Sequence, residues 1–328
     1  MRVAINGLGR IGRAVYRILQ SNSNLEVAAL NDIVDSENIA YLIKYDSVYG
    51  RFNKDIRPDK GGLTVEGKRI PLYNEKDLSD IPWQEHGVDL VFECTGAFNE
   101  RKMLQKHLEG GVKHVILSAP AKDDDIPAVV FGVNKPQSDE AIISCASCTT
   151  NCIAPVVEVI DRYYGIKKAT LTTVHAYTST QGIVDTSNKK IRRGRAAAEN
   201  FVPTTTGATG ATTKVIKHLE HKFEGSAIRG PVPAGSIADM NFVIKKNATK
   251  EEINQAFVNE AVSERYEGIL GVTREPLVSS DIIKDPRASV VDLGMTMSID
   301  GDLIKVMSWY DNEWGYAMQM VRTAEHLC

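Results

Sequence analysis

The chain has 328 residues, 43% of them hydrophobic and 25% charged, which is enough apolar material for about two globular domains and excludes intrinsic disorder. The 39 Lys and Arg residues against 42 Asp and Glu give a net charge of −3, too balanced for a protein that binds nucleic acid mainly by neutralising phosphates. Charged residues interrupt every apolar run before the roughly 18 residues that a membrane span needs.

The N-terminus and the cysteines indicate a compartment. The first apolar residues lead directly into a glycine-rich segment, leaving no room for a signal peptide, so we expect a cytoplasmic protein. Five cysteines is an odd number, and the four at positions 94, 145, 148 and 152 do not resemble a secreted disulfide framework. Their spacing does not match a zinc site either, so we expect no metal and at least one reactive thiol.

The first half of the chain predicts alternating strands and helices. Residues 2–6 are an apolar run before a glycine-rich turn, residues 10–20 place apolar side chains on one helical face, and residues 25–30 are a second apolar run. This order is that of a βαβ unit. Further apolar runs at 88–94, 112–117, 129–133 and 141–144 favour a Rossmann-type α/β domain with a mainly parallel, doubly wound sheet.

The second half predicts an α+β domain with a mostly antiparallel sheet. Helices are expected at 153–164, 250–263 and 313–327, and strands at 169–177, within 228–245, and at 288–299 and 303–310. Between 178 and 206 lies a long polar stretch with little periodicity. A loop of that length inside a compact domain is usually functional or disordered.

Three glycines between the first predicted strand and helix indicate a dinucleotide site. Gly7, Gly9 and Gly12 match G-x-G-x-x-G, and Asp32 follows the next strand. The glycines permit a tight turn and close approach to a pyrophosphate, while the helix N-terminus attracts the anion. Asp32 would accept bonds from ribose hydroxyls and repel a 2′-phosphate, which favours NAD over NADP. Alternatively, the glycines only close a turn and Asp32 caps the following helix.

The segment S-C-A-S-C-T-T-N at 144–151 places a cysteine at a predicted helix start. There Cys148 faces unpaired N–H groups and the positive end of the helix dipole, so we expect a lowered pKa and a poised nucleophile. The same N–H groups could hold an oxyanion. Alternatively, Cys148 is a small buried residue beside threonines. Cys152, one helical turn on, is expected to be buried packing.

His175 lies in a predicted strand, where a histidine is usually a hydrogen-bonded core residue. If it faces Cys148, it can stabilise the thiolate and shuttle a proton to and from the substrate oxygen. For the other six histidines we expect surface positions: His86, His107, His114, His218, His221 and His326.

A cluster of five basic residues between 189 and 195, flanked by threonines, is a candidate anion site together with Arg229. Its alternatives are a solvated face, an interdomain ion-pair patch or, less favoured because no aromatic residues interleave, a nucleic-acid surface.

Taken together and in order, the motifs resemble phosphorylating glyceraldehyde-3-phosphate dehydrogenases over essentially the whole chain. The matching segments are I-N-G-L-G-R-I-G-R at 5–13, K-Y-D-S at 44–47, A-S-C-T-T-N-C at 146–152, T-V-H-A-Y-T at 173–178, T-T-G-A at 205–208 and W-Y-D-N-E-W-G-Y at 309–316.

The resemblance implies reversible oxidative phosphorylation of D-glyceraldehyde 3-phosphate with NAD and inorganic phosphate, by a homotetramer in glycolysis or gluconeogenesis. It implies an NAD-binding domain at 1–147, a catalytic domain at 148–311 and a C-terminal helix at 312–328 that returns to the first. Cys148 would be the nucleophile and His175 its base. Cofactor-binding residues would be Gly7, Gly9, Arg10, Ile11, Gly12, Asp32, Lys76, Ser118 and Asn312.

The same resemblance implies two anion sites. Thr178 and Arg229 would hold the substrate phosphate. The attacking inorganic phosphate would contact Ser147, Thr149, Arg193, Thr206 and Gly207.

Some positions depart from the family pattern. Gly230 stands where relatives usually have a bulky apolar residue, Cys145 replaces a frequent Asn, and Thr186 and Ser187 are similar to NADP-accepting members. Erythrose-4-phosphate dehydrogenase, which hydrolyses its thioester, is one alternative function. Another is a protein that binds RNA or a surface receptor with vestigial catalysis. Aspartate-semialdehyde dehydrogenase uses similar cysteine chemistry but lacks the T-V-H-A-Y-T and W-Y-D-N-E motifs.

Overall fold

The structure is a computed structural model that describes residues 1–136 and 140–327. The chain forms two compact units, each with its own sheet. The first comprises Met1–Val129, Lys135–Ala146 and Ala317–Cys328, and the second comprises Val130–Asn134 and Ser147–Tyr316. Within the described residues, no helix is both long enough and apolar enough to cross a membrane.

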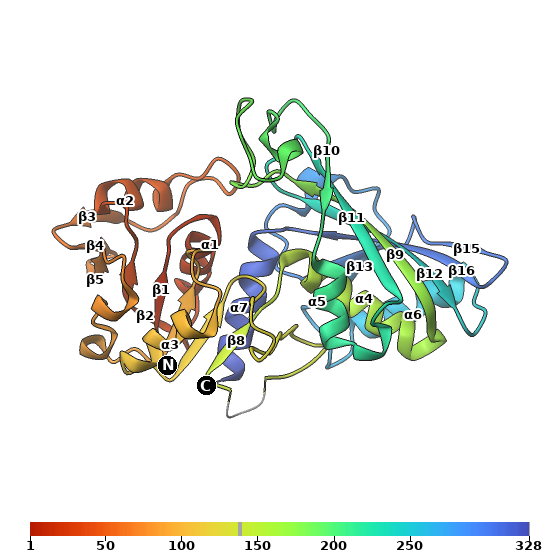
Figure 1. Ribbon diagram of the computed structural model, residues 1–328, viewed down its shortest axis with the longest axis horizontal. Coiled ribbons are helices and arrows are strands. Elements are labelled where there is room, and N and C mark those ends of the chain that lie inside the picture. Colours follow the sequence, from red (N-terminus) through yellow and green to blue (C-terminus); the bar gives the residue numbers. More distant parts are fainter. Residues whose placement is uncertain (137–139, 328) are drawn as a thin grey trace. The chain divides into compact units, whose positions relative to one another are not determined.

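The sheet of the first unit has the strand order β3-β4-β5-β2-β1-β6-β7-β8 (Figure 1). From β5 to β8 every pair is parallel, whereas β3, β4 and β5 pair antiparallel as hairpins. The strands are β1 (Arg2–Asn6), β2 (Glu26–Asn31), β3 (Ile56–Asp59), β4 (Gly62–Val65), β5 (Lys68–Tyr73), β6 (Leu90–Glu93), β7 (His114–Leu117) and β8 (Ile142–Ser144). The expected doubly wound sheet is confirmed, with an antiparallel edge that the sequence pattern did not predict.

Three helices connect these strands: α1 (Arg10–Leu19), α2 (Ser36–Lys44) and α3 (Arg101–Glu109). The central strands β1, β6 and β7 are buried from end to end except at the first residues of β1 and β7, which is why they read as continuous apolar runs. The expected strand at 129–133 is wrong. Val133 and Asn134 both donate backbone bonds to the Val130 carbonyl, so the segment is a turn, and 130–134 belongs to the second unit.

The sheet of the second unit has the order β10-β11-β9-β12-β16-β14-β13, with β15 beside β16 (Figure 1). Most pairs are antiparallel, as expected, but β9–β11 and β13–β14 are parallel. The strands are β9 (Ile166–Ala176), β10 (Val202–Thr205), β11 (Phe223–Gly230), β12 (Ser236–Ile244), β13 (Leu270–Thr273), β14 (Ser289–Asp292), β15 (Met297–Ile299) and β16 (Leu303–Tyr310).

The helices of this unit are α4 (Cys148–Tyr164), α5 (Ala208–Val215) and α6 (Lys250–Ala261), and α7 (Trp314–His326) continues into the first unit. Helix α4 is buried along most of its length and packs its apolar face into the core formed with β9, β12 and β16. The long stretch from 178 to 206, expected as a loop, contains a short 3-10 helix at Ile191–Gly194 and ends in β10.

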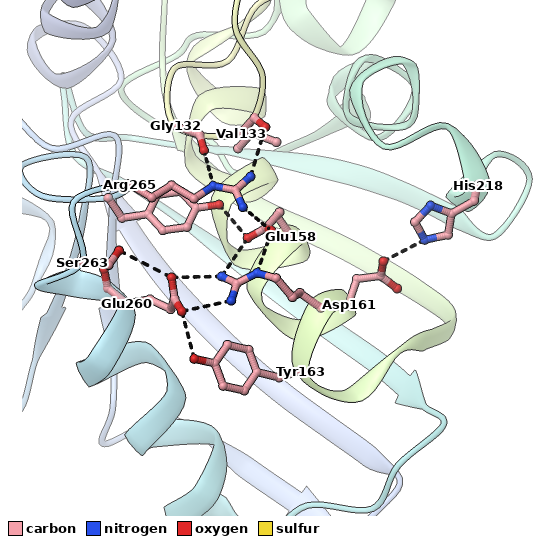
Figure 2. Close-up of polar contacts among 11 residues, drawn as sticks. Gly132, Val133, Glu158, Asp161, Tyr163, His218, Glu260, Ser263 and Arg265 are labelled. Atoms are coloured by element: carbon pink, nitrogen blue, oxygen red, sulfur yellow. Dashed lines mark hydrogen bonds and ion pairs between the residues drawn. The ribbon is translucent and has the colours of Figure 1, made fainter.

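A network of ion pairs fixes the later turns of α4 (Figure 2). The Glu158 carboxylate accepts bonds from Arg162 at 2.8 Å, Arg265 at 2.8 Å and the Tyr266 hydroxyl at 2.7 Å. Arg162 also pairs with Glu260 of α6 at 2.9 Å. The helix that begins at Cys148 is thereby tied to α6 and to the segment around residue 265 at its far end.

Candidate active site

The glycine turn after β1 has the geometry of a dinucleotide loop. Gly7 has φ +91°, and a Cβ there would lie 2.6 Å from the Thr95 nitrogen. At Gly12 a Cβ would lie 1.9 Å from the Gly7 carbonyl oxygen, whereas at Gly9 it would meet nothing within 4 Å. Two of the glycines are therefore required by packing, and the third leaves open space at the point where backbone can approach a pyrophosphate.

The N-terminus of α1 fits an anion. Gly9 occupies the N-cap without a side-chain cap, and the first turn carries no acidic residue. Asp32 lies beside the turn, where its carboxylate accepts bonds from the Leu8 N–H at 2.5 Å and the Val34 N–H at 3.0 Å. The alternative that Asp32 caps the following helix is wrong, because Asp35 is the N-cap of α2.

The other predicted cofactor residues of the first unit differ in their contacts and in their exposure. Arg10 pairs with Asp46 at 2.5 Å and lies over the Tyr49 ring, and the Ser118 N–H donates to the Glu93 carbonyl at 3.0 Å. Ile11 follows Arg10 in α1 and is half-buried, while the Lys76 side chain is exposed.

In the second unit Cys148 is the first residue of α4, as the sequence predicts. Ser147 is the N-cap, and its hydroxyl accepts from the Thr150 N–H at 3.1 Å. The Cys148 Sγ lies 3.4 Å from Nε2 of His175, which projects from β9. The sequence could not show this contact, since 27 residues separate the two.

The expected lowering of the thiol pKa is wrong for the site without ligands. Burial raises the pKa of Cys148 above its usual value, while the charge of Arg229 and the hydrogen bonds from Thr149 and from the backbone N–H groups at the helix start offset only part of that rise. The helix terminus therefore acts as predicted, but desolvation of the thiolate outweighs it. The resting site holds a neutral thiol.

Two partners meet the inner nitrogen of His175. Its Nδ1 lies 2.6 Å from the Ala176 carbonyl oxygen and 2.8 Å from Nη1 of Arg229, which also donates to that carbonyl at 3.0 Å. The carbonyl can only accept and the guanidinium can only donate, so Nδ1 donates to the first or accepts from the second, and Nε2 faces the thiol in both tautomers. Burial and the neighbouring Arg229 charge lower the pKa of His175 to about 3, so the imidazole is neutral.

Arg229 is opposite His175 because β9 and β11 pair in parallel register. Its Nε is buried and has no hydrogen-bond partner within the described residues. Burial and the charge of Arg229 lower the pKa of Arg193, which donates to the Thr204 hydroxyl at 3.0 Å. Neither arginine pairs with a carboxylate in the part of the chain that the structure describes. Two cations without counter-ions, one with an unused buried donor, fit a phosphate group.

Gly230 does not disturb this arrangement. It pairs with Ala176 in the same register, and a Cβ there would make ordinary contact with the Phe201 ring at 3.7 Å. Glycine at this position, in place of a bulky apolar residue, therefore does not change the pairing of the strand that carries Arg229.

The remaining predicted residues of the second unit differ in their contacts. Thr149 bonds to the Tyr310 hydroxyl at 2.9 Å, and Asn312 accepts from the Ser236 hydroxyl at 3.0 Å. Thr206 accepts from the Ala208 N–H at 3.1 Å just before α5, whose N-cap is Gly207, and the space beside Gly207 is open. Thr178 bonds to the Thr180 hydroxyl at 2.9 Å rather than to Arg229.

Tyr310 is a site residue that the sequence analysis did not single out. Its hydroxyl bridges Thr149 and Thr173 at 2.9 Å each, and its ring packs edge-on against His175. It stands within the W-Y-D-N-E motif, which was the available signal. Cys152 is fully buried beside Ser289 and Ser308, and burial raises its pKa to about 12, which confirms it as inert packing.

The expected position of His107 is also wrong. We expected it at the surface, but it is fully buried in α3, bonded to Trp83 and Glu93. The polar residues around it in the sequence gave no indication of this partner set.

A dinucleotide turn on a doubly wound sheet, together with a thiol–imidazole pair in an α+β domain, defines a dehydrogenase that works through a cysteine. Residues 1–101 match the family model described as glyceraldehyde 3-phosphate dehydrogenase, NAD binding domain, and residues 147–312 match that of the C-terminal domain. The chain belongs to the glyceraldehyde-3-phosphate dehydrogenase family, and its cofactor is NAD.

Curated relatives with the same family name match this chain over almost their whole length. The chain is 48% identical to glyceraldehyde-3-phosphate dehydrogenase of Thermotoga maritima, covering 99% of this chain and 98% of the relative. It is 46% identical to glyceraldehyde-3-phosphate dehydrogenase 2 of Streptomyces avermitilis, over 98% and 96% of the two chains. The identity to glyceraldehyde-3-phosphate dehydrogenase 2 of Bacillus subtilis is 44%, over 100% and 96%.

Proposed function

We propose that this chain catalyses the reversible oxidative phosphorylation of D-glyceraldehyde 3-phosphate to 1,3-bisphosphoglycerate, in glycolysis or gluconeogenesis. The observation that carries the proposal is the Sγ–Nε2 contact of 3.4 Å, beside an arginine whose buried Nε has no partner among the described residues. A nucleophile, its base and a phosphate anchor then lie within one unit.

Catalysis begins with attack of Cys148 on the aldehyde carbon. The thiol proton passes to Nε2 of His175 as the carbon–sulfur bond forms, so the low histidine pKa is compensated by transfer in concert with attack. The N–H groups at the start of α4 stabilise the developing oxyanion of the thiohemiacetal.

Oxidation and phosphorolysis follow on the same sulfur. Bound NAD supplies the hydride acceptor. His175 first returns the thiol proton to the oxyanion, which completes the thiohemiacetal hydroxyl. It then takes that hydroxyl proton as the hydride departs, which leaves a Cys148 thioester. Inorganic phosphate then attacks the thioester carbonyl, the acyl phosphate leaves, and the sulfur is released as thiolate to regain its proton.

The anion roles follow from two guanidiniums that pair with no carboxylate among the residues the structure describes. Arg229 and Thr178 hold the phosphate of the substrate, and Arg193 with Ser147, Thr149, Thr206 and Gly207 holds the attacking phosphate. The charge of Arg229 also stabilises the Cys148 thiolate when it forms.

The cofactor is held by the first domain, at 1–147. Gly7, Gly9, Gly12 and the N-terminus of α1 take the pyrophosphate, and Asp32 takes the ribose. Arg10, Ile11, Lys76 and Ser118 complete that site. Asn312, whose amide oxygen accepts a bond from Ser236, orients the nicotinamide carboxamide. It is the first residue of the C-terminal segment 312–328, which follows the catalytic domain at 148–311.

We also propose a cytoplasmic homotetramer that acts on small molecules, with no nucleic-acid partner in this role. Support comes from large apolar side chains exposed on the stretch from 178 to 206, namely Ile183, Val184, Ile191 and Phe201. Large apolar side chains left exposed along one segment favour a protein interface there.

The test is NADH formation from glyceraldehyde 3-phosphate with and without inorganic phosphate, for wild type and Cys148→Ser. We expect phosphate-dependent turnover in wild type and none in the variant, which should still bind NAD. Rapid NADH formation independent of phosphate would instead indicate erythrose-4-phosphate dehydrogenase chemistry, and normal turnover by the serine variant would contradict the nucleophile. Salt-dependent RNA binding without turnover would support a binding protein.

A further inference from the structure

Behind the glycine turn lies a buried charge that catalysis does not use. Glu93 ends β6, directly opposite Asn6 at the end of β1, and its side chain is 0% exposed. Within the described residues it pairs with neither lysine nor arginine, and the ionisable group that bonds to it is His107. A carboxylate in such a place is tolerated only when hydrogen bonds replace its hydration.

Four donors supply those bonds. The first carboxylate oxygen accepts from the Thr95 N–H at 2.9 Å and from the Thr95 hydroxyl at 2.5 Å. The second accepts from the Asn6 amide at 2.6 Å and from Nε2 of His107 at 3.2 Å. Both oxygens are therefore used twice.

The donors are themselves fixed in direction. Trp83 can only donate, and its Nε1–H lies 3.0 Å from Nδ1 of His107, so the proton of the neutral imidazole is on Nε2 and points to Glu93. Asn31 donates to the amide oxygen of Asn6 at 2.8 Å, which turns the Asn6 NH2 group toward Glu93. The hydrogen bonds to Glu93 all point their protons at its side chain, which must therefore accept every one and donate none.

These same partners enclose the dinucleotide turn. Gly7 follows Asn6 and packs against Thr95, with no room for a side chain between them. The Glu93 carbonyl also accepts from the Ser118 N–H at 3.0 Å. We propose that Glu93 is a positioning residue for NAD, because it fixes the two residues between which the Gly7 turn is held.

A glutamine at position 93 would have the same shape and the wrong polarity. Its NH2 group would face either the two Thr95 donors or the donors of Asn6 and His107. If the new NH2 group faced Asn6 and His107, then either the Asn6 amide would turn its NH2 toward the Asn31 donor or the His107 proton would move to Nδ1, opposite the Trp83 N–H. If it faced Thr95, the Thr95 backbone N–H, which can only donate, would lose its acceptor. The mismatch moves the Gly7 turn without removing any atom from the cleft.

The inference rests on the proposed NAD site, so NAD binding to the full chain is measured directly by calorimetry, beside steady-state kinetics. We expect Glu93→Gln to weaken NAD binding about tenfold or more, and to raise the KM for NAD likewise, with kcat at saturating NAD and the KM for aldehyde within about threefold. Glu93→Asp, which keeps an acceptor-only group, should lose less.

Leu104→Ala is the matched control, because Leu104 is a fully buried apolar residue of the same helix as His107 and takes no part in the chain of hydrogen bonds. It should lower Tm and leave the KM for NAD unchanged. If Glu93→Gln fails to fold, Thr95→Val, which removes one donor, should weaken NAD binding about threefold.

Unchanged NAD binding in the folded variants, or equal losses in Glu93→Asp and Glu93→Gln, would overturn the inference. So would a parallel rise of the KM for NAD in Leu104→Ala, since destabilisation alone would then explain the effect. A wild-type protein that binds no NAD would contradict the proposed function itself.

Discussion

Arg229 offers the sharpest test of the substrate site. Arg229→Leu removes a guanidinium whose buried Nε has no partner among the described residues and whose Nη1 donates to the Ala176 carbonyl. A charge-assisted hydrogen bond contributes about 1.5–3 kcal/mol, and truncating one member of a buried charged pair costs about 2–5 kcal/mol. A loss of about 3–4 kcal/mol predicts a fall of roughly 10²–10³-fold in kcat/KM for glyceraldehyde 3-phosphate.

The assay compares that substrate with glyceraldehyde, which lacks the phosphate. Without Arg229, the pKa of Cys148 rises further, which disfavours the thiolate, while the pKa of His175 rises, which makes it a better base. These effects oppose each other, so activity on glyceraldehyde should change by less than about tenfold. Arg229→Lys keeps the charge without the planar fork and should fall between wild type and Arg229→Leu.

Arg193→Leu is the matched variant in the same cluster, and it should raise the KM for inorganic phosphate rather than for the aldehyde. An equal loss on the phosphorylated and unphosphorylated aldehydes in Arg229→Leu would refute the reasoning. Arg229 would then act on the thiol and imidazole alone, and the substrate phosphate would bind elsewhere.

Three further outcomes follow. Burial raises the pKa of the Glu260 carboxyl, but hydrogen bonds from Arg162 and Tyr163 outweigh it and leave the pKa below its usual value. The resulting stabilisation is present above about pH 4.5 and lost as pH falls through the folded-state pKa, so Glu260→Gln should lower Tm at pH 7 by a few degrees, and the difference from wild type should shrink as the pH falls further below 4.5. Cys152→Ala should keep the rate of inactivation by iodoacetamide, because Cys152 is fully buried and inactivation proceeds through Cys148; a slower rate in this variant would show that the buried thiol takes part. Asp32→Ala should narrow the preference for NAD over NADP by about tenfold, measured as the ratio of kcat/KM values, and an unchanged ratio would exclude the carboxylate as the discriminating group.

The sequence predicted the elements that lie in the middle of each sheet. Strands such as β1 and β6 are buried on both faces, so their composition alone marks them. The hairpins β3 to β5 were not predicted, because these short edge strands mix buried and exposed positions and form no continuous apolar run. The turn at 130–134 was misassigned because its apolar side chains pack into a core without strand pairing.

At the site, the sequence predicted local backbone features, but it did not predict pKa values that depend on opposing effects of burial and charge. The helix start at Cys148 follows from sequence, as does the glycine turn. The direction of the thiol pKa does not, since it depends on how much water the fold excludes from the sulfur. The partners of His107 could not be predicted either, because Trp83 and Glu93 reach it from separate segments.

The last helix has a consequence for synthesis. Residues from Ala317 onward belong to the first unit, where Met320 and Val321 are buried and Glu325 accepts a bond from the Asn22 amide at 2.8 Å. That unit's sheet is complete at Ser144, yet the ribosome must add a further 170 or so residues, taking roughly 10–35 s, before this covering segment emerges. The first unit is therefore the first to be synthesised but the last to gain all of its residues. A nascent or truncated chain exposes the apolar surface that α7 would cover.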